Sequence, residues 1–261
     1  MVGLGEADDL AARILHGADS HAGGAESATL WHQRVPERVA LSASHIFAWH
    51  LAAIAALLVL HLLAAALRIE FGRGQTLWRL FQLSGEANVP SFFSAVALLL
   101  AGGLALQIGR IDTHDRRRGW WLAGFILLFL ALDEAASLHE QLNWFGPRRA
   151  GQMSLFWLLP YGVLVVATVA TLFPFWLRLP RATQVGLALA AIVYVAGAMG
   201  MEVVESRFHS QSEDGVLYWP RILSVGAEET LEMLGVAILI RTLLRHASRL
   251  SQPALMVTIR G

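Results

Sequence analysis

Cysteine and lysine are both missing from this chain of 261 residues, so all 20 basic residues are arginine. Without cysteine the chain has no disulfides, no thiolate nucleophile and no ligands for an iron–sulfur cluster. Without lysine it has no Schiff-base chemistry and no Walker-type phosphate site. Any chemistry in this protein therefore rests on carboxylate, imidazole and hydroxyl groups.

Charge is also scarce, because only 15% of the residues are charged and the 20 basic residues are balanced by 20 acidic ones. Soluble domains carry about 25% charged residues. Here 56% of the residues are hydrophobic and the mean hydropathy is +0.53. This composition excludes a soluble core, and the balanced charge argues against a nucleic-acid partner. We expect a membrane protein whose partner is the lipid bilayer, while the sequence identifies no protein partner.

The apolar residues are gathered into six blocks, each near the ~20 residues that cross a bilayer as a helix. The blocks are 45–67, 90–109, 119–142, 154–177, 183–205 and 222–244. We predict an all-α, polytopic membrane protein with a bundle of about six transmembrane helices. The predicted organisation is a weakly ordered N-terminal tail at 1–44, the bundle at 45–245 and a C-terminal tail at 246–261.

The distribution of arginine predicts the orientation. Six crossings place both termini on one side, and thirteen of the 20 arginines fall on that side against seven on the other. The positive-inside rule then predicts that both termini are cytoplasmic. No apolar run followed by a small-residue cleavage site occurs in the first 44 residues, so we expect no removable signal peptide. Tryptophans are expected to mark the two interfaces: Trp120, Trp121 and Trp176 the inner one, and Trp144, Trp157 and Trp219 the outer one.

Acidic residues within the apolar blocks are the main functional signal. A charge at mid-bilayer costs about 2.5 kcal/mol or more, so such residues normally face the bundle interior and are paired or protonated. With six alternating crossings, the acids of the third, fifth and sixth blocks all reach the outer half of the membrane. The eight residues are Asp133, Glu134, Glu140, Glu202, Glu205, Glu228, Glu229 and Glu232.

Helical rotation predicts which side chains of the third block share a face. On a continuous helix Asp133, Ser137 and Glu140 lie close together, whereas His139 points well away from them. We therefore expect His139 to be an interfacial or packing residue. The polar residues expected to support the acidic pocket are Glu86, Asn88, Ser137 and Glu228.

Several carboxylates a few ångströms apart cannot all be ionised without a cation among them, which leaves three hypotheses. The first is a divalent metal such as Mn, Fe or Zn, used for chemistry on a lipid or periplasmic substrate. Its expected ligands are Asp133, Glu134, Glu140, Glu202, Glu205, His209, Glu229 and Glu232.

The second hypothesis is a proton relay in a proton-coupled or cation transporter. Its expected members are Glu202, Glu205, Glu229 and Glu232. The third is a structural or assembly subunit in which arginines pair with the acids. The sequence contains no Glu-x-x-His pair of a di-iron bundle, no Gly-x-Ser-x-Gly motif and no H-E-x-x-H motif. It therefore assigns no catalytic residue and leaves open whether the protein is an enzyme.

Two histidines of the first block, His50 and His61, share one helical stripe and could suggest a haem site. A second axial ligand would be needed at matching depth on a facing helix. We expect both to be ordinary polar residues with satisfied hydrogen bonds.

Several longer strings resemble a group of uncharacterised bacterial six-helix membrane proteins. These strings are GEANVPSFFSAVALLL, LFLALDEAASLHEQL, LPRATQVGLALAAIVYVAGAMGMEVVES and AEETLEMLG, within residues 80–244. The shared motifs are a GEANxP start to the second helix and an LDExxxxHE helix. The resemblance implies a protein of the bacterial inner membrane with several crossings and implies no activity, substrate or cofactor.

Overall fold

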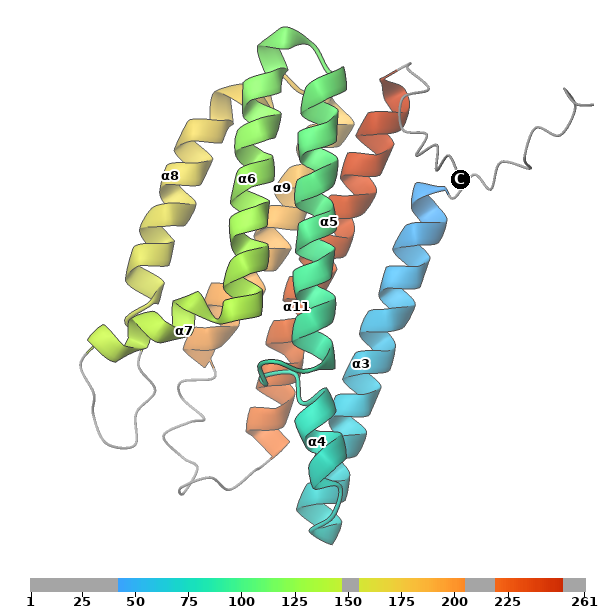
Figure 1. Ribbon diagram of the computed structural model, residues 1–261, viewed down its shortest axis with the longest axis vertical. Coiled ribbons are helices and arrows are strands. Elements are labelled where there is room, and N and C mark those ends of the chain that lie inside the picture. The colour runs from blue at the N-terminus through green and yellow to red at the C-terminus, as the bar shows by residue number, and fades with distance from the viewer. Residues whose placement is uncertain (1–41, 147–154, 205–218, 251–261) are drawn as a thin grey trace, which may run out of the picture. The chain divides into compact units, whose positions relative to one another are not determined.

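The computed structural model describes residues 42–146, 155–204 and 219–250, and every regular element in these ranges is helical. The helices are α3 (Ala43–Phe71), α4 (Gln75–Phe81), α5 (Val89–Ile111), α6 (His114–Ala136), α7 (Leu138–Leu142), η2 (Asn143–Phe145), α8 (Leu158–Leu177), α9 (Arg181–Val195), the π-helical segment η3 (Ala196–Met201) and α11 (Trp219–Arg249). An all-α architecture is confirmed (Figure 1).

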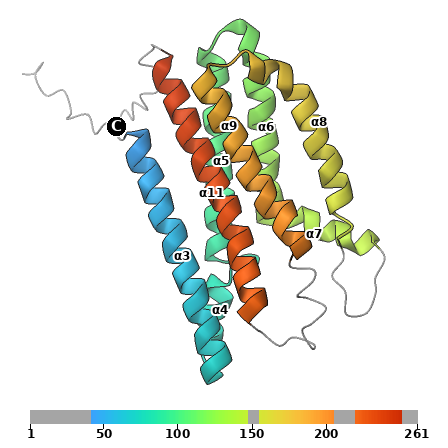
Figure 2. The same ribbon diagram turned by 180° about the vertical axis from the view of Figure 1, so that it is seen from behind.

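Five helical segments of the described chain are long and apolar enough to cross a membrane. They are α3, α5, α6, α8 and the continuous segment Arg181–Val204, which contains α9 and η3. Helix α11 has a comparable length but carries three glutamates and several arginines, and it is not among them. It packs against α3, α5, α9 and η3, so it completes a bundle of six long helices (Figures 1 and 2). The fold is that of a polytopic membrane protein.

Helices α5 and α6 form the tightest pair of the bundle. Small residues allow this approach, because a Cβ at Gly102 would lie 3.1 Å from the carbonyl oxygen of Gly124 on α6. Ala97, Ala101 and Ala105 of α5 are buried at the same spacing of four residues. Small residues four apart let helix backbones pack closely in a membrane, where lipid gives no hydrophobic drive to association.

Helix α11 is the most buried long helix, although it is the least apolar of the six. Its buried residues include Met233, Val236, Ala237, Ile240 and Leu243, which contribute to two of the hydrophobic clusters. A helix with carboxylates on it is costly to expose to lipid. Its central position shields these carboxylates from the acyl chains.

Two of the long helices are irregular at the same end of the bundle. Helix α6 ends at Ala136, and Ser137 adopts a left-handed backbone with φ 52° before α7 begins at Leu138. On the neighbouring segment, α9 passes into the π-helix η3 just before Glu202. The predicted third block, 119–142, is therefore two helices, because the residue at its break reverses the helical path of the backbone.

Candidate functional site

The acidic residues of four segments meet at one end of the bundle. This end contains the last turn of α6, the end of α9–η3, the N-terminal half of α11 and the loop before α5 (Figures 1 and 2). Helix α7 lies across the end of α6. We call the side chains gathered here the acidic cluster: Glu86, Asp133, Glu134, Glu140, Glu202 and Glu232, together with His139.

Asp133 is the best-held carboxylate of the acidic cluster. It is 7% exposed, and its Oδ1 accepts hydrogen bonds from the Tyr161 hydroxyl at 2.7 Å and from the backbone N–H of His139 at 2.9 Å. Its Oδ2 lies 3.1 Å from Nδ1 of His139. Three donors stabilise the ionised form of this carboxylate.

His139 is thus a central member of the cluster, and the expectation that it points away from the acids was wrong. The helical rotation used for that expectation requires an unbroken helix, but the left-handed Ser137 turns the chain back toward Asp133. Burial lowers the pKa of His139, but the hydrogen bond and the negative charge of Asp133, with further charge from Glu140, raise it above its ordinary value of 6.5. The imidazolium is favoured, and it supplies positive charge to the cluster.

An aromatic wall covers one side of the acidic cluster. The rings of His139, Trp157 and Tyr161 lie within 5.1 to 6.1 Å of one another, centroid to centroid. The indole N–H of Trp157 donates to Oε1 of Glu202 at 3.3 Å. Trp157 is only 6% exposed, so it is a donor inside the bundle, whereas the sequence suggested an outer interface marker. Position in the sequence alone did not distinguish these two roles.

Glu86 and Glu140 form a carboxyl–carboxyl pair at the exposed mouth of the cluster. Their side chains lie close enough to interact. Two ionised carboxylates repel each other and have no donor between them, so a proton on one of the two groups would relieve the repulsion. Burial, and then the negative charge of Glu86, raise the pKa of Glu140 above its ordinary value.

Glu134 and Glu232 connect this mouth with the interior of the bundle. The charges of His139, Asp133, Glu86 and Glu140 all act on Glu134. Glu232 on α11 experiences in turn the charges of Glu134 and His139. The exposed pair, Glu134 and Glu232 therefore belong to one series of interacting charges, which also includes Asp133 and Glu202.

The helix irregularities lie against this series. A Cβ at Gly197 of η3 would lie 3.0 Å from Cγ of Glu232 and 2.9 Å from the carbonyl oxygen of Glu228. Among the described residues, the non-glycine residues with positive φ are Ala87 and Ser137, which stand beside Glu86 and between Asp133 and Glu140. Strained backbone and π-helical turns concentrate at functional sites.

The remaining residues expected at the site differ in their surroundings. Glu228 is buried, Glu229 is half-buried, and both have further interactions. Asn88 caps α5, with its side chain accepting from Ser91 N–H at 3.1 Å and donating to the Gln82 carbonyl at 2.7 Å. Its role is structural. Glu205 and His209 lie outside the described residues.

No group of three or more histidine, aspartate or glutamate side chains in residues 42–146, 155–204 and 219–250 is arranged to hold a metal ion. Asp133 and Glu202 instead accept hydrogen bonds from His139, Tyr161 and Trp157.

Comparison with protein families gives one match, to the domain of unknown function DUF8692, over residues 50–247. The chain belongs to this family. The matched range contains every described member of the acidic cluster. The comparisons with curated proteins and with solved structures found no match. Membership agrees with the uncharacterised family that the sequence resembles.

The opposite end of this DUF8692 domain contains a second buried aspartate. Asp112, between α5 and α6, accepts from the Trp120 indole N–H at 2.7 Å and from the Thr113 backbone N–H at 2.7 Å. Nε2 of His246 lies 3.3 Å from its Oδ2, and Arg116 lies 3.6 Å from its Oδ1. Trp120 is 1% exposed, so it too is an internal donor and not the interface marker that the sequence suggested.

Charge at this second aspartate is balanced locally. Burial by itself would raise the pKa of Asp112, but the hydrogen bonds from Trp120, Thr113 and His246 outweigh burial and lower it. The last turn of α11, beyond the predicted sixth block, holds His246, and burial lowers the pKa of its imidazole. The neutral ring accepts from the Thr183 hydroxyl on Nδ1 at 3.0 Å.

His61 on α3 has a purely structural environment. Its Nδ1 accepts from the Leu83 backbone N–H at 3.2 Å, and its Nε2 lies 3.3 Å from the carbonyl oxygen of Ile222. Both ring nitrogens are used within the bundle. The expectation of a satisfied polar residue is confirmed for His61.

Proposed function

We propose that this protein is a proton-coupled membrane transporter whose acidic cluster loads and releases protons. The observation that carries the proposal is the crowding of carboxyl groups at one end of the bundle, because groups that repel one another in the ionised form favour bound protons. Protonatable carboxylates within membrane bundles are typical of proton relays in pumps and transporters.

The order of exposure supports a path for the proton. Glu86 and Glu140 are exposed at the end of the bundle, Glu134 and Glu232 are half-buried, and Asp133 is buried. In this proposal a proton taken up by the exposed pair passes to Glu134 and then to Glu232, which are less exposed and belong to the same group of interacting charges. Asp133 holds His139 in place, and the imidazolium limits the negative charge of the path.

The two irregular helices support a transport role. Interrupted helices in transporters expose backbone carbonyls, and the negative ends of half-helices favour cations. The C-terminal end of α6 points at the acidic cluster, and the π-helical η3 packs against Glu232. These irregular segments are also positions where a helix can bend between two conformations.

A divalent metal bound by the same carboxylates is the rival proposal from another class of function. The described residues offer hydrogen-bonded pairs where a metal would need converging ligands. A structural subunit with arginine-paired acids is the third possibility. The charges that act most strongly on Glu134 come from His139 and from other carboxylates. These observations favour protons over both alternatives.

We place the protein in the bacterial inner membrane with both termini cytoplasmic. The arginine distribution supports this orientation. The acidic cluster then opens toward the periplasm, where protons enter down the electrochemical gradient. The end of the bundle with Asp112 and His246 faces the cytoplasm.

Proton flux into proteoliposomes is the test. Vesicles containing a pH-sensitive dye receive a potassium diffusion potential with valinomycin, and the rate of internal acidification is measured. We expect wild-type protein to acidify the lumen and Glu134→Gln to lose most of this flux, because an amide cannot carry the proton. Glu70→Gln is the matched control, since Glu70 is an exposed acid at the same end that binds Trp219 outside the cluster.

Metal content, measured by mass spectrometry on the same preparations, separates the rival proposal. Equal acidification rates for wild type and Glu134→Gln would contradict the relay. One or two equivalents of Mn, Fe or Zn that are retained by wild type and lost in Glu134→Gln would establish the metal site instead.

A further inference from the structure

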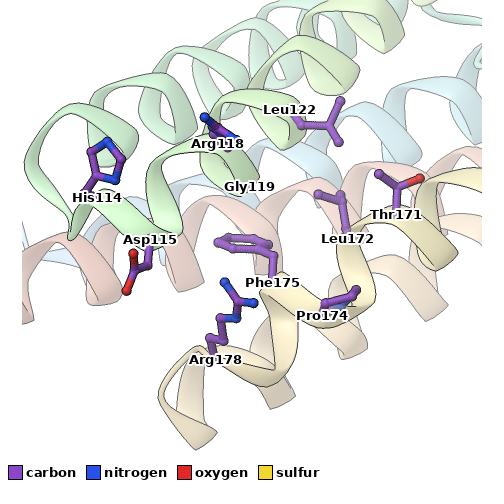
Figure 3. A pocket seen from close by; sticks show the side chains of 10 residues that line it. All are labelled: His114, Asp115, Arg118, Gly119, Leu122, Thr171, Leu172, Pro174, Phe175 and Arg178. Carbon is purple, nitrogen blue, oxygen red and sulfur yellow. The ribbon is translucent and has the colours of Figure 1, made fainter.

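A cavity of about 480 Å³ opens between α6 and α8, at the end of the bundle opposite the acidic cluster (Figure 3). It is formed by the first turns of α6 and the last turns of α8. Neither helix contributes a member of the acidic cluster from these turns. The cavity is therefore separate from the proposed proton path.

Two arginines stand at the mouth of this cavity. Arg118 of α6 and Arg178, which follows α8, are both exposed, and neither has an ion-pair partner within the described part of the chain. In Figure 3 the guanidinium of Arg178 extends from α8 toward the α6 side of the cavity, near Asp115 and Phe175. With one acid against two arginines, the mouth has a net positive charge.

The inner part of the cavity is apolar. Leu122 of α6 faces Leu172 and Phe175 of α8 across it. The hydroxyl of Thr171 donates to the carbonyl oxygen of Ala167 on its own helix at 2.7 Å, so it needs no partner in the cavity. An apolar slot beneath a cationic mouth matches an amphiphile with an anionic head.

The cavity lies at the depth in the membrane where lipid headgroups are expected. Trp121 and Trp176 lie at the same ends of α6 and α8, and tryptophan prefers the interface between headgroups and acyl chains. Helix α8 has no buried residue and packs mainly on α6. In the membrane, acyl chains therefore surround α8 and have direct access to the slot beside it.

We propose that this cavity is a binding site for an anionic phospholipid. The phosphodiester oxygens accept hydrogen bonds from Arg118 and Arg178, whose planar guanidinium groups match phosphate in bidentate geometry. One acyl chain lies along Leu122, Leu172 and Phe175. Basic pockets between membrane helices suit anionic headgroups, and each arginine near the surface adds to the attraction.

Lipid selectivity in reconstituted vesicles tests this site. The protein is placed in phosphatidylcholine vesicles with spin-labelled phosphatidylglycerol or spin-labelled phosphatidylcholine, and the motionally restricted fraction of each is measured by electron paramagnetic resonance. We expect wild type to prefer phosphatidylglycerol, and Arg118→Gln/Arg178→Gln to lose this preference about tenfold. Both arginines are exposed, so the fold is retained, which circular dichroism verifies.

Arg117→Gln/Arg245→Gln is the matched control, because both arginines are exposed at the same end but do not line the cavity. The control is expected to keep the preference. An equal loss in both double variants would show a general surface-charge effect and overturn the site.

A third variant and a competition experiment test the lipid itself. Leu122→Trp fills the slot and leaves both arginines in place, so the preference should fall, whereas an unchanged preference would overturn the acyl half of the site. Inorganic phosphate at the ionic strength of a chloride control should not displace the labelled lipid. Displacement by phosphate alone would identify a free-anion site instead.

Discussion

Asp112 and Asp133 lie at opposite ends of the bundle, and each accepts hydrogen bonds from a histidine and from an aromatic side chain. The surroundings of the two differ in charge. Asp112 has Arg116 beside it, whereas Asp133 lies among Glu134, Glu140 and other carboxylates. The same local motif is therefore charge-balanced at one end and part of a negative cluster at the other.

This difference separates a structural site from a functional one. Asp112 is a buried carboxylate whose hydrogen bonds come from three donors and whose charge is balanced by a nearby cation. It connects the end of α5 with the ends of α6 and α11. Carboxylates crowded together repel one another unless protons or cations are present, and this repulsion lowers stability. Such a cluster is costly to stability, and the transport role proposed above accounts for its presence.

Removal of the balanced carboxylate is expected to have the largest effect on stability. Asp112→Ala leaves the Trp120 indole, the Thr113 N–H and the buried His246 without their acceptor. We expect the free energy of unfolding to fall by about 3–5 kcal/mol. Unfolding in mild detergent, followed by circular dichroism, measures it. A loss as small as that of an exposed acid such as Glu70→Gln would contradict the structural role.

Neutralisation of a crowded carboxylate should raise the free energy of unfolding, which is the opposite of the effect expected for Asp112→Ala. Glu134→Gln keeps the shape of the side chain and removes one negative charge from beside Asp133, Glu86 and Glu140. We expect the protein to become more stable by about 1 kcal/mol while it loses proton flux. The same unfolding measurement tests this prediction, and marked destabilisation would favour the arginine-paired structural network.

The two histidines should give opposite dependences on pH. The pKa of His139 is raised, so its stabilising contribution is complete below about pH 6.5 and is lost as the pH rises through its folded-state pKa. The pKa of His246 is lowered, so its contribution is present above about pH 6.5 and is lost as the pH falls.

Melting temperatures at a series of pH values check this contrast. The difference between wild type and His139→Gln should shrink as the pH rises, and the difference for His246→Gln should shrink as the pH falls. Identical pH dependences for the two variants would remove the distinction between the two ends.

The smallest effect is expected at the break between α6 and α7. Ser137→Gly places glycine at φ 52°, where it has no steric penalty, so stability should stay within about 0.5 kcal/mol of wild type or rise. Ser94→Gly makes the same change inside α5 and should cost about 1 kcal/mol. Unfolding of the two variants compares them, and an equal loss would argue against the left-handed turn.

The sequence predicted the coarse architecture well because membrane helices leave long apolar runs. Five of the six predicted spans, the all-α fold and the gathering of acids at one end follow from block lengths and alternating crossings. The positions of Asp133, Glu202 and Glu232 within their blocks were enough to place them at one depth. The contacts that individual side chains make at that depth could not be predicted in this way.

The sequence did not predict the roles of His139, Trp120 and Trp157. The role of His139 depends on one left-handed serine, and serine gives no signal of a break comparable with glycine or proline. Each tryptophan looks like an interface marker until its neighbour is known, since its role depends on the buried carboxylate that it contacts. Tyr161 had no such signal, because its partner Asp133 is 28 residues away in the sequence.

Infrared spectroscopy of the protonated carboxyl band tests the central claim most directly. Wild-type protein in lipid at neutral pH should show the C=O stretch of a protonated carboxyl, with a deuterium shift, and Glu140→Gln should lose part of it because one of the crowded carboxyl groups is gone. Glu70→Gln should leave the band unchanged. A wild-type spectrum without any protonated carboxyl at neutral pH would contradict a proton-loading site at this end of the bundle.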